Sequence, residues 1–335
     1  MVTYFITGGD GFVGFHLTQE LMKNEENKVV IYDAHKHFLP VNESKWFKYQ
    51  NFRISELDKF GERVIRVKGD VADSGRLQEA LEEHKPQKVV HLASLPVAGV
   101  SNFYPAESRS NIFDTISTLL DVLKDPTKFP LERLVYTSSS MVYGDFMRYS
   151  NGDIIPARED QTCNPKGIYG AMKLAGEHLV RAYTQRFGIP HTIIRPSAVY
   201  GPTDCNRRVS EIFLTNALEG KKLVLDNGGL HQLDFSYIRD VVRGFALAMD
   251  SDHASNETFN ITRGEGRSIR ELAEIVKSLV PSAKIIAGKS EPYRPNRGAL
   301  DISKAKNLLG YEPEYSLEDG MKEYHEFVSN FSSKK

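Results

Sequence analysis

Short apolar segments alternate with longer amphipathic segments along the first part of the chain. The apolar, β-rich segments predict buried strands at Val2–Thr7, Lys28–Asp33, Arg63–Val67, Lys88–Leu92, Leu134–Thr137 and His191–Arg195. Apolar positions at helical spacing predict helices at Phe12–Met22, Ser74–Glu83, Ser108–Leu123 and Ile168–Arg186. Strands that alternate with helices in this way predict an α/β fold with a doubly wound parallel sheet.

Composition excludes several classes of protein. The 335 residues include 43 Lys and Arg against 44 Asp and Glu, so net charge gives no reason to expect nucleic acid or an acidic membrane as a partner. No apolar run approaches the roughly 20 residues that span a bilayer, and the N-terminus lacks the basic region of a signal peptide. The two cysteines, Cys163 and Cys205, have neither disulfide-framework nor zinc spacing. We expect a cytoplasmic protein with reduced thiols.

A glycine-rich turn links the first predicted strand to the first predicted helix. Gly8, Gly11 and Gly14 stand at three-residue intervals, with Phe12 and Val13 between the last two. Glycine lets the backbone approach a pyrophosphate, and the helix N-terminus supplies unpaired N–H groups and partial positive charge. The turn therefore predicts a dinucleotide site, with a tight turn that binds no ligand as the alternative.

Together with this turn, the pattern predicts a Rossmann-type domain and a smaller C-terminal α/β cap that binds substrate. The cap is expected because, after Pro196, loops rich in Gly, Pro and Asn separate short helices. The polar and aromatic residues 34–61 are interpreted as an excursion after the second strand. The predicted Rossmann domain covers residues 1–200, with 236–262 returning to it, and the cap covers 201–335, mainly 201–235 and 263–335.

Two acidic residues follow predicted strands near the turn. Asp33 ends the second strand, where a carboxylate can accept hydrogen bonds from both ribose hydroxyls of NAD and would repel the 2′-phosphate of NADP. Lys36 lies close by and would blunt this preference, but NAD remains the predicted cofactor. Asp70 and Val71 follow the third strand and can hold the adenine edge; a helix N-cap is the alternative interpretation of Asp70.

Candidate catalytic groups lie further along the chain. Tyr169 and Lys173 are four residues apart, which places them on one face of a predicted helix. A nearby ammonium and a nicotinamide cation favour the phenolate, so Tyr169 can exchange a proton with a sugar hydroxyl while a hydride moves. The fifth strand leads into a hydroxyl-rich run that includes Ser139, at the strand end where doubly wound sheets bind ligands.

These motifs together resemble the extended short-chain dehydrogenase/reductase family, in its NAD-dependent nucleotide-sugar epimerase/dehydratase branch. The resemblance covers almost the whole chain. It implies Tyr169 as the acid/base, Lys173 as its partner and Ser139 as the hydroxyl that orients the substrate. The residues that it assigns to the cofactor, with those from the preceding arguments, are Gly8, Gly11, Phe12, Val13, Gly14, Asp33, Asp70, Val71, Leu92, Ala93, Ser94, Tyr169, Lys173 and Pro196.

The sequence also departs from the family pattern. The 4,6-dehydratases carry an Asp-Glu pair after the catalytic hydroxyl residue, where this chain has Ser140 and Met141, so dehydration is disfavoured. Leu233 and Ala198 replace an Arg and an Asn that often contact the substrate.

Two arginines could compensate for the missing contacts. Arg208 precedes a cap helix, and Arg294 matches the family's late Arg-Pro-Gly-Asp segment, although here it reads Arg294-Pro295-Asn296-Arg297. An arginine fork suits phosphate geometry. Ser139, Ser140, Arg208 and Arg294 are therefore the predicted substrate-binding residues, and an exposed surface arginine is the alternative for each of the last two.

The leading hypothesis is a nucleotide-sugar epimerase acting at C4. Its keto sugar would form transiently, and the hydride would return to the opposite face of the sugar. A net-redox sugar dehydrogenase or 4-ketoreductase and a hexuronate decarboxylase are alternatives, and a non-enzymatic NAD-binding protein is disfavoured. His35 and His37 lack a third ligand, so no metal is predicted. The resemblance also implies a homodimer that forms through helices 108–123 and 168–186.

Overall fold

The computed structural model describes residues 1–36, 43–289 and 295–333. Its strands are β1 (Thr3–Thr7), β2 (Lys28–Asp33), β3 (Val64–Lys68), β4 (Lys88–His91), β5 (Arg133–Thr137), β6 (His191–Arg195), β7 (Val199–Tyr200), β8 (Lys222–Leu225), β9 (Gln232–Asp234), β10 (Ser236–Tyr237), β11 (Glu257–Asn260), β12 (Gly266–Ser268) and β13 (Lys284–Ala287). Its α-helices are α1 (Phe12–Leu21), α2 (Glu43–Asp58), α3 (Ser74–His84), α4 (Ala98–Phe103), α5 (Pro105–Ser108), α6 (Thr115–Leu123), α7 (Ile168–Phe187), α8 (Val209–Leu218), α9 (Ile238–Asp250), α10 (Ile269–Leu279), α11 (Ser303–Leu309) and α12 (Leu317–Ser333).

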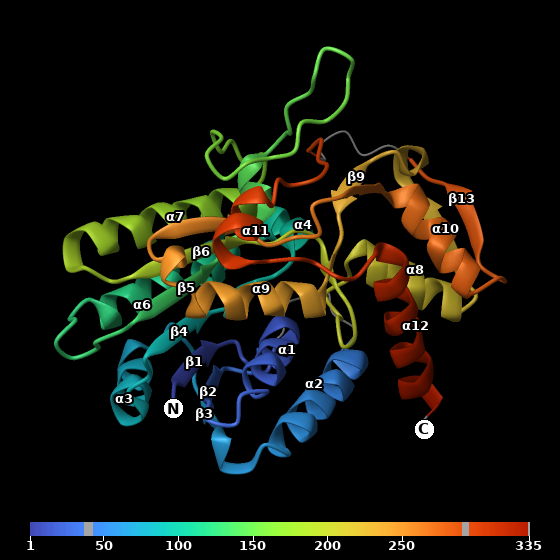
Figure 1. The fold of residues 1–335 in the computed structure, drawn as a ribbon. Helices are drawn as coiled ribbons and strands as arrows, with labels where there is room; N and C mark the ends of the chain where they lie inside the picture. Colours follow the sequence, from blue (N-terminus) through green and yellow to red (C-terminus); the bar gives the residue numbers. More distant parts are fainter. Residues whose placement is uncertain (37–42, 290–294, 334–335) are drawn as a thin grey trace.

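Seven of the described strands form one parallel sheet in the order β11-β6-β5-β4-β1-β2-β3 (Figure 1). In its centre, Ile6 of β1 is in register with Ile31 of β2 and Val90 of β4. The chain winds from β1 outward to β3 and then from β4 in the other direction, which is the doubly wound Rossmann-like topology. The predicted fold class is therefore confirmed.

Alternate residues of the central strands face two separate cores, because side chains of a strand point to opposite faces of the sheet. Ile6 and Ile31 join the core beneath α1 and α9. Phe5 and Val30 join the other core, which lies beneath α3 and α6. Figure 1 shows these helices in layers on the two sides of the sheet. Both faces are covered, which explains the nearly continuous apolar sequence of β1 and β2.

The segment predicted as helix 108–123 contains a change of helix type. The α-helix α5 passes directly into a π-helical turn, η2 (Arg109–Asp114), and then into α6. Such π-turns occur mostly as short insertions within α-helices and frequently at functional sites. Here η2 carries Asn111 to the wall of the pocket described below.

The excursion after β2 contains helix α2, which contacts α1 and the C-terminal helix α12 (Figure 1). The contact with α12 is aromatic: the ring centroids of Tyr49 and Phe331 are 5.0 Å apart, and those of Phe52 and Phe327 are 5.5 Å apart. Tyr49 is buried and the other three rings are partly buried, so their packing holds α12 against α2.

The remaining elements build a smaller lobe beside the carboxyl ends of the sheet strands. β8 pairs with β13 in parallel and β9 pairs with β12 antiparallel, with α8 and α10 packed together. Ser268 and Glu271 form a capping box that starts α10. Helix α11 lies within the predicted cap range but contacts α9 and β11 of the sheet lobe. The two-domain division itself stays a prediction.

No helix within the described ranges is long and apolar enough to cross a membrane.

Candidate active site

A pocket of about 680 Å³ opens at the carboxyl ends of the sheet strands. Its lining includes residues after β1, β4 and β6 and residues at the ends of β2 and β5. Residues of β8, β9 and α10, which belong to the smaller lobe, also line it. In doubly wound sheets this edge, where the winding changes direction, is the place where ligands bind.

The glycine turn between β1 and α1 forms one end of the pocket. Gly8 has a φ of +72°, and a Cβ there would lie 2.8 Å from the Ala93 backbone nitrogen. A Cβ at Gly14 would lie 2.6 Å from the Gly9 Cα, so α1 packs against the turn without room for a side chain. Gly11 is the N-cap of α1 and makes no side-chain cap. The first N–H groups of α1 are therefore available for a pyrophosphate.

Asp33 lies at the end of β2 on the same side of the pocket. Its carboxylate accepts hydrogen bonds from the backbone N–H groups of Asp10, at 3.1 Å, and His35, at 2.7 Å. Burial raises the pKa of Asp33 above its ordinary value. These bonds fix the carboxylate and leave further lone pairs for ribose hydroxyls.

Asp70 and Val71 also line the pocket. The Asp70 carboxylate accepts the Ala72 backbone N–H at 3.0 Å and pairs with the Lys36 ammonium. The N-cap of α3 is Asp73, so the alternative interpretation of Asp70 as that cap is wrong. Because Lys36 is engaged by Asp70, its charge is partly offset beside the ribose position.

The remaining predicted cofactor residues converge on this pocket, and two buried oxygens there lack partners. The Ser94 Oγ and the Thr137 Oγ1 have no hydrogen-bond partner in the described structure. Buried polar groups are nearly always paired, so these two oxygens indicate a missing ligand. The glycine cradle, the carboxylate of Asp33 and these hydroxyls fit NAD. The lining includes Phe12, Val13, Leu92, Ala93, Ser94 and Pro196.

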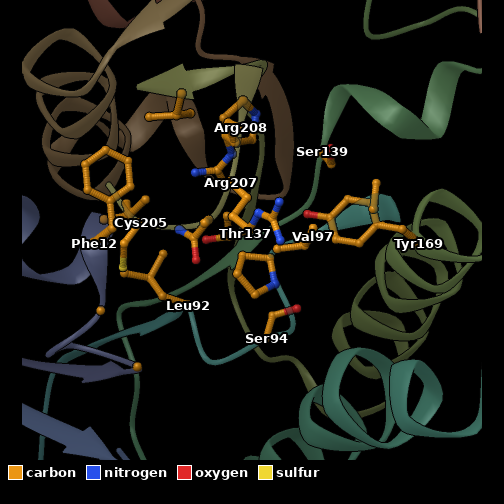
Figure 2. Close-up of a pocket in the computed structure, with 18 of the residues that line it drawn as sticks. Phe12, Leu92, Ser94, Val97, Thr137, Ser139, Tyr169, Cys205, Arg207 and Arg208 are labelled. Atoms are coloured by element: carbon orange, nitrogen blue, oxygen red, sulfur yellow. The ribbon is translucent and has the colours of Figure 1, made fainter. Parts of the chain in front are cut away.

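Ser139, Tyr169 and Lys173 meet in the middle of the pocket. Figure 2 shows Tyr169 extending from α7 with its hydroxyl toward the cavity, and Ser139 on a separate segment beside it. The Lys173 ammonium donates a hydrogen bond to the Thr137 carbonyl at 2.8 Å and lies 6.0 Å from the centroid of the Tyr169 ring. Ser139 is the N-cap of the short helix η3 (Ser140–Tyr143) and accepts the Met141 N–H at 3.2 Å.

Electrostatics tune the two titratable groups of this set. Burial lowers the pKa of Lys173 from 10.5 to about 7. Burial also raises the pKa of Tyr169 above 10.0, while the positive charge of Arg208 and the hydrogen bond with Ser139 oppose that increase. Tyr169 is therefore protonated at neutral pH in the absence of a bound cation, and added positive charge would favour its phenolate.

Of the predicted substrate-binding residues, the structure places Ser139, Ser140 and Arg208 along the pocket. Ser140 is buried and lines the pocket, and Arg208 lines the cap side, where its Nη1 lies 3.3 Å from the Asp204 Oδ1 (Figure 2). Arg294 lies outside the described residues. Leu233 and Ala198, the departures from the family pattern, both line the pocket. Ala198 has a φ of +36°, a conformation that Asn tolerates better than Ala.

Sequence reasoning missed Arg297, which lines the pocket from the segment that precedes Asp301. Its Nη2 donates to the Ser197 Oγ at 2.8 Å and to the Ser140 Oγ. The available signal was its position in the same short segment as Arg294. Gln50 and Arg53 of α2 also reach the pocket, although the excursion had been given no functional role.

Metal ligation has no candidate among the described residues, because no three His, Cys, Asp or Glu side chains are grouped to hold an ion. The His35 Nε2 instead lies 2.9 Å from the Asp10 Oδ2. His37 lies outside the described residues.

The Rossmann-like sheet and the glycine turn are typical of a dinucleotide-binding protein. In agreement, residues 4–262 match the model of the NAD dependent epimerase/dehydratase family. The chain belongs to this family, and NAD is its cofactor.

Individual relatives span nearly the whole chain. The uncharacterized UDP-glucose epimerase YtcB of Bacillus subtilis is 30% identical over 324 residues, covering 94% of each chain. UDP-glucuronic acid decarboxylase 3 of Arabidopsis thaliana is 30% identical over 324 residues, covering 94% of this chain and 86% of the relative. The crystal structure of UDP-glucuronic acid 4-epimerase from Bacillus cereus, in complex with UDP-glucuronic acid and NAD, superposes with a TM-score of 0.87 at 29% identity, covering 98% and 99% of the two chains.

Proposed function

We propose that the protein is an NAD-dependent nucleotide-sugar epimerase that inverts C4 through a transient 4-keto sugar. The observation that carries the proposal is the convergence of Ser139, Tyr169 and Lys173 beside the glycine turn in one pocket. Met141 provides no acid or base where dehydratases carry Glu, because a thioether does not exchange protons. The similarity to a UDP-glucuronic acid 4-epimerase supports the same reaction class.

The chain's own residues supply the proton chemistry. NAD, when bound, provides the acceptor that takes the C4 hydride and returns it to the opposite face of the sugar. The Tyr169 phenolate accepts the proton of the C4 hydroxyl as the carbonyl forms, and the phenol gives it back as the carbonyl is reduced. Ser139 donates a hydrogen bond to the same oxygen, and the Lys173 ammonium stabilises the phenolate. No net oxidation results.

We also propose that the diphosphate of the substrate lies toward the cap. Arg208 is at the N-cap position of α8 and carries a fork of donors on the cap side of the pocket, with Arg207 next to it (Figure 2). Guanidinium groups bind phosphate oxygens in a bidentate manner. Ser139 and Ser140 would then face the sugar.

Two other reactions remain candidates because specific observations favour them. Leu233 and Ala198 leave the pocket without two polar groups that often contact the substrate, which favours a net-redox dehydrogenase or 4-ketoreductase acting on a different sugar. The similarity to UDP-glucuronic acid decarboxylases favours a hexuronate decarboxylase. A non-enzymatic NAD-binding role would leave the Ser139, Tyr169 and Lys173 set without a purpose.

One experiment separates these reactions. The purified, NAD-loaded protein is mixed with UDP-, GDP-, CDP- and dTDP-sugars, the absorbance of reduced nicotinamide is followed, and products are identified by NMR. We expect an isomer of one sugar with no net reduced nicotinamide. Stoichiometric formation or consumption of NADH would replace epimerisation with net redox chemistry, and a pentose product with release of carbon dioxide would replace it with decarboxylation.

We further propose a cytoplasmic homodimer that forms through segments 108–123 and 168–186. Helices α6 and α7 lie side by side, with the Tyr183 hydroxyl donating to Asp121 at 2.9 Å. Cys163 and Cys205 are both free, which suits a reducing compartment. Light scattering of the purified protein tests the dimer, and a monomer mass at micromolar concentration would exclude it.

A further inference from the structure

Arg297 carries a positive charge into the pocket without an anionic partner. Among the described residues, no carboxylate lies within ion-pair distance of its guanidinium. Its contacts are the hydroxyls of Ser140 and Ser197 and the thioether of Met141, at 3.3 Å from Nη1. Its Nε is buried and has no partner. A charge removed from water in this way is costly unless an anion joins it.

The nearest source of negative field does not neutralise Arg297. Asp234 acts on the guanidinium through space, but its carboxylate oxygens already accept hydrogen bonds from Thr262, Leu300 and the backbone of Gly264. These contacts bind Asp234 into the junction between β9 and the segments 262–264 and 298–301. Among the residues that the structure describes, no carboxylate therefore pairs with Arg297, and an anion bound in the pocket would provide that partner.

The contacts of Arg297 locate that anion at the reacting end of the sugar. Ser140 follows directly after Ser139, and Met141 belongs to the same short helix. The charge of Arg297 also acts on the Tyr169 phenol, where it opposes the increase in pKa that burial causes. Arg208, by contrast, approaches from the cap and is paired with Asp204. An anion on Arg297 is thus next to the proton-exchanging groups rather than with a diphosphate on the cap side.

The chemistry of the site matches a carboxylate. The Ser140 and Ser197 oxygens accept N–H bonds from Arg297, and their described contacts leave the O–H of each free to donate. A planar guanidinium flanked by a hydroxyl donor suits a planar carboxylate. In a hexuronate, the C6 carboxylate is attached to C5, the carbon next to the C4 that reacts.

We propose that Arg297, with the Ser140 hydroxyl, binds the C6 carboxylate of a nucleotide-linked hexuronate and so selects uronates over neutral hexoses. This inference rests on the proposed function, because it assigns C4 to the Tyr169 side of the pocket. Arg297 stands where the family's Arg-Pro-Gly-Asp segment has Asp. Because the selectivity would depend on this replacement, it would be a property of this chain.

Binding to the NAD-loaded protein tests the proposal independently of turnover. Calorimetric titration with UDP-glucuronic acid and with UDP-glucose is expected to show at least about tenfold tighter binding of the uronate. In Arg297→Met, the dissociation constant for the uronate should rise by at least that factor while the value for the hexose changes by less than about twofold. Arg297→Lys should restore part of the preference, because it keeps the charge and loses the fork.

The matched control is Arg270→Met, since Arg270 is an exposed cap arginine that bonds the Gly228 carbonyl. It should leave both dissociation constants unchanged. Equal affinity of the wild-type protein for uronate and hexose, or an equal loss of both in Arg297→Met, would overturn the proposal. If the uronate preference and its loss in Arg297→Met are observed but neither sugar is epimerised, the proposed function fails and the assignment of Arg297 stands.

Discussion

Glu177 of α7 and Arg195 at the end of β6 form a buried two-point contact. The Glu177 Oε1 lies 2.9 Å from the Arg195 Nε, and its Oε2 lies 2.7 Å from the Arg195 Nη2. The Ser138 hydroxyl also donates to the Glu177 Oε1, at 2.5 Å. Because Glu177 is one helical turn after Lys173, this contact holds the catalytic face of α7 against the ends of β5 and β6.

Removing Glu177 should destabilise the protein strongly. Glu177→Leu leaves the Arg195 guanidinium buried and unpaired, so the free energy of unfolding in urea is expected to fall by about 3–5 kcal/mol. The double variant Glu177→Leu/Arg195→Met should lose less than the sum of the two single losses, because it removes both charges. Glu82→Leu, which breaks the exposed pair with Lys128, is the control and should lower the free energy of unfolding far less than Glu177→Leu does. Additive losses would show that Glu177 and Arg195 do not act as a pair.

Six of the seven strands of the sheet were predictable, and the central ones among them are buried on both faces. The bounds of Lys28–Asp33 and His191–Arg195 agree with the apolar segments residue for residue. The short strands β7, β8, β9, β10, β12 and β13 were not predicted, since most have only two or three residues and none forms a continuous apolar segment of the length seen in β1 and β2. The π-helical turn at Arg109–Asp114 was also not predicted, because over six residues the spacing of apolar positions does not distinguish a π-helix from an α-helix.

Within the site, the residues that the structure brings together are those that the sequence ties to a local motif. The glycine turn, Asp33, Ser139 and the Tyr169–Lys173 spacing each combine residue type with a neighbouring strand or helix, and all line one pocket. Arg297 depends instead on the tertiary path that brings its segment back over Ser140 and Ser197, more than ninety residues earlier in the chain. The roles assigned to the glycine turn, Tyr169 and Lys173 remain predictions, which the following variants test.

Replacing the phenol should separate proton transfer from cofactor binding. Tyr169→Phe removes the acid/base and keeps the ring, so kcat is expected to fall by roughly 10²- to 10⁴-fold. NAD should remain bound, because the glycine turn and Asp33 are unchanged in this variant. Tyr183→Phe on the same helix is the matched control, because that hydroxyl bonds Asp121 outside the pocket. A wild-type rate in Tyr169→Phe would refute the acid/base assignment.

The buried ammonium of Lys173 should make stability depend on pH in the absence of NAD. Its pKa is about 7 in the folded protein against an ordinary 10.5, so between these values the unfolded chain binds more protons. Stability therefore rises with pH through this window, and the cost of burying the charge is fully present below pH 7. Lys173→Met removes that cost. We measure the free energy of unfolding of Lys173→Met minus that of the wild-type protein. This difference should be largest in favour of the variant near pH 6 and should become smaller toward pH 9. A difference that does not depend on pH would contradict the lowered pKa of Lys173.

Two glycines of the turn should respond differently to the same methyl group. A Cβ at Gly14 would meet the Gly9 Cα and the Gly8 carbonyl oxygen at 2.6 Å, and backbone atoms cannot move aside cheaply. Gly14→Ala should therefore lower the free energy of unfolding by about 1–3 kcal/mol. A Cβ at Gly11 would meet only the Gly8 oxygen, at 3.0 Å, and Gly11 has an ordinary φ of −72°.

Gly11→Ala should thus preserve stability to within about 1 kcal/mol while its methyl occupies the space beside the first N–H groups of α1. The dissociation constant of NAD, measured by calorimetry, should rise by about tenfold or more, because the pyrophosphate can no longer approach the helix N-terminus. The free energies of unfolding of Gly14→Ala and Gly11→Ala are both measured in urea without NAD, so the two values can be compared directly. If Gly11→Ala bound NAD as tightly as wild type, the pyrophosphate would have to lie elsewhere than on the N-terminus of α1.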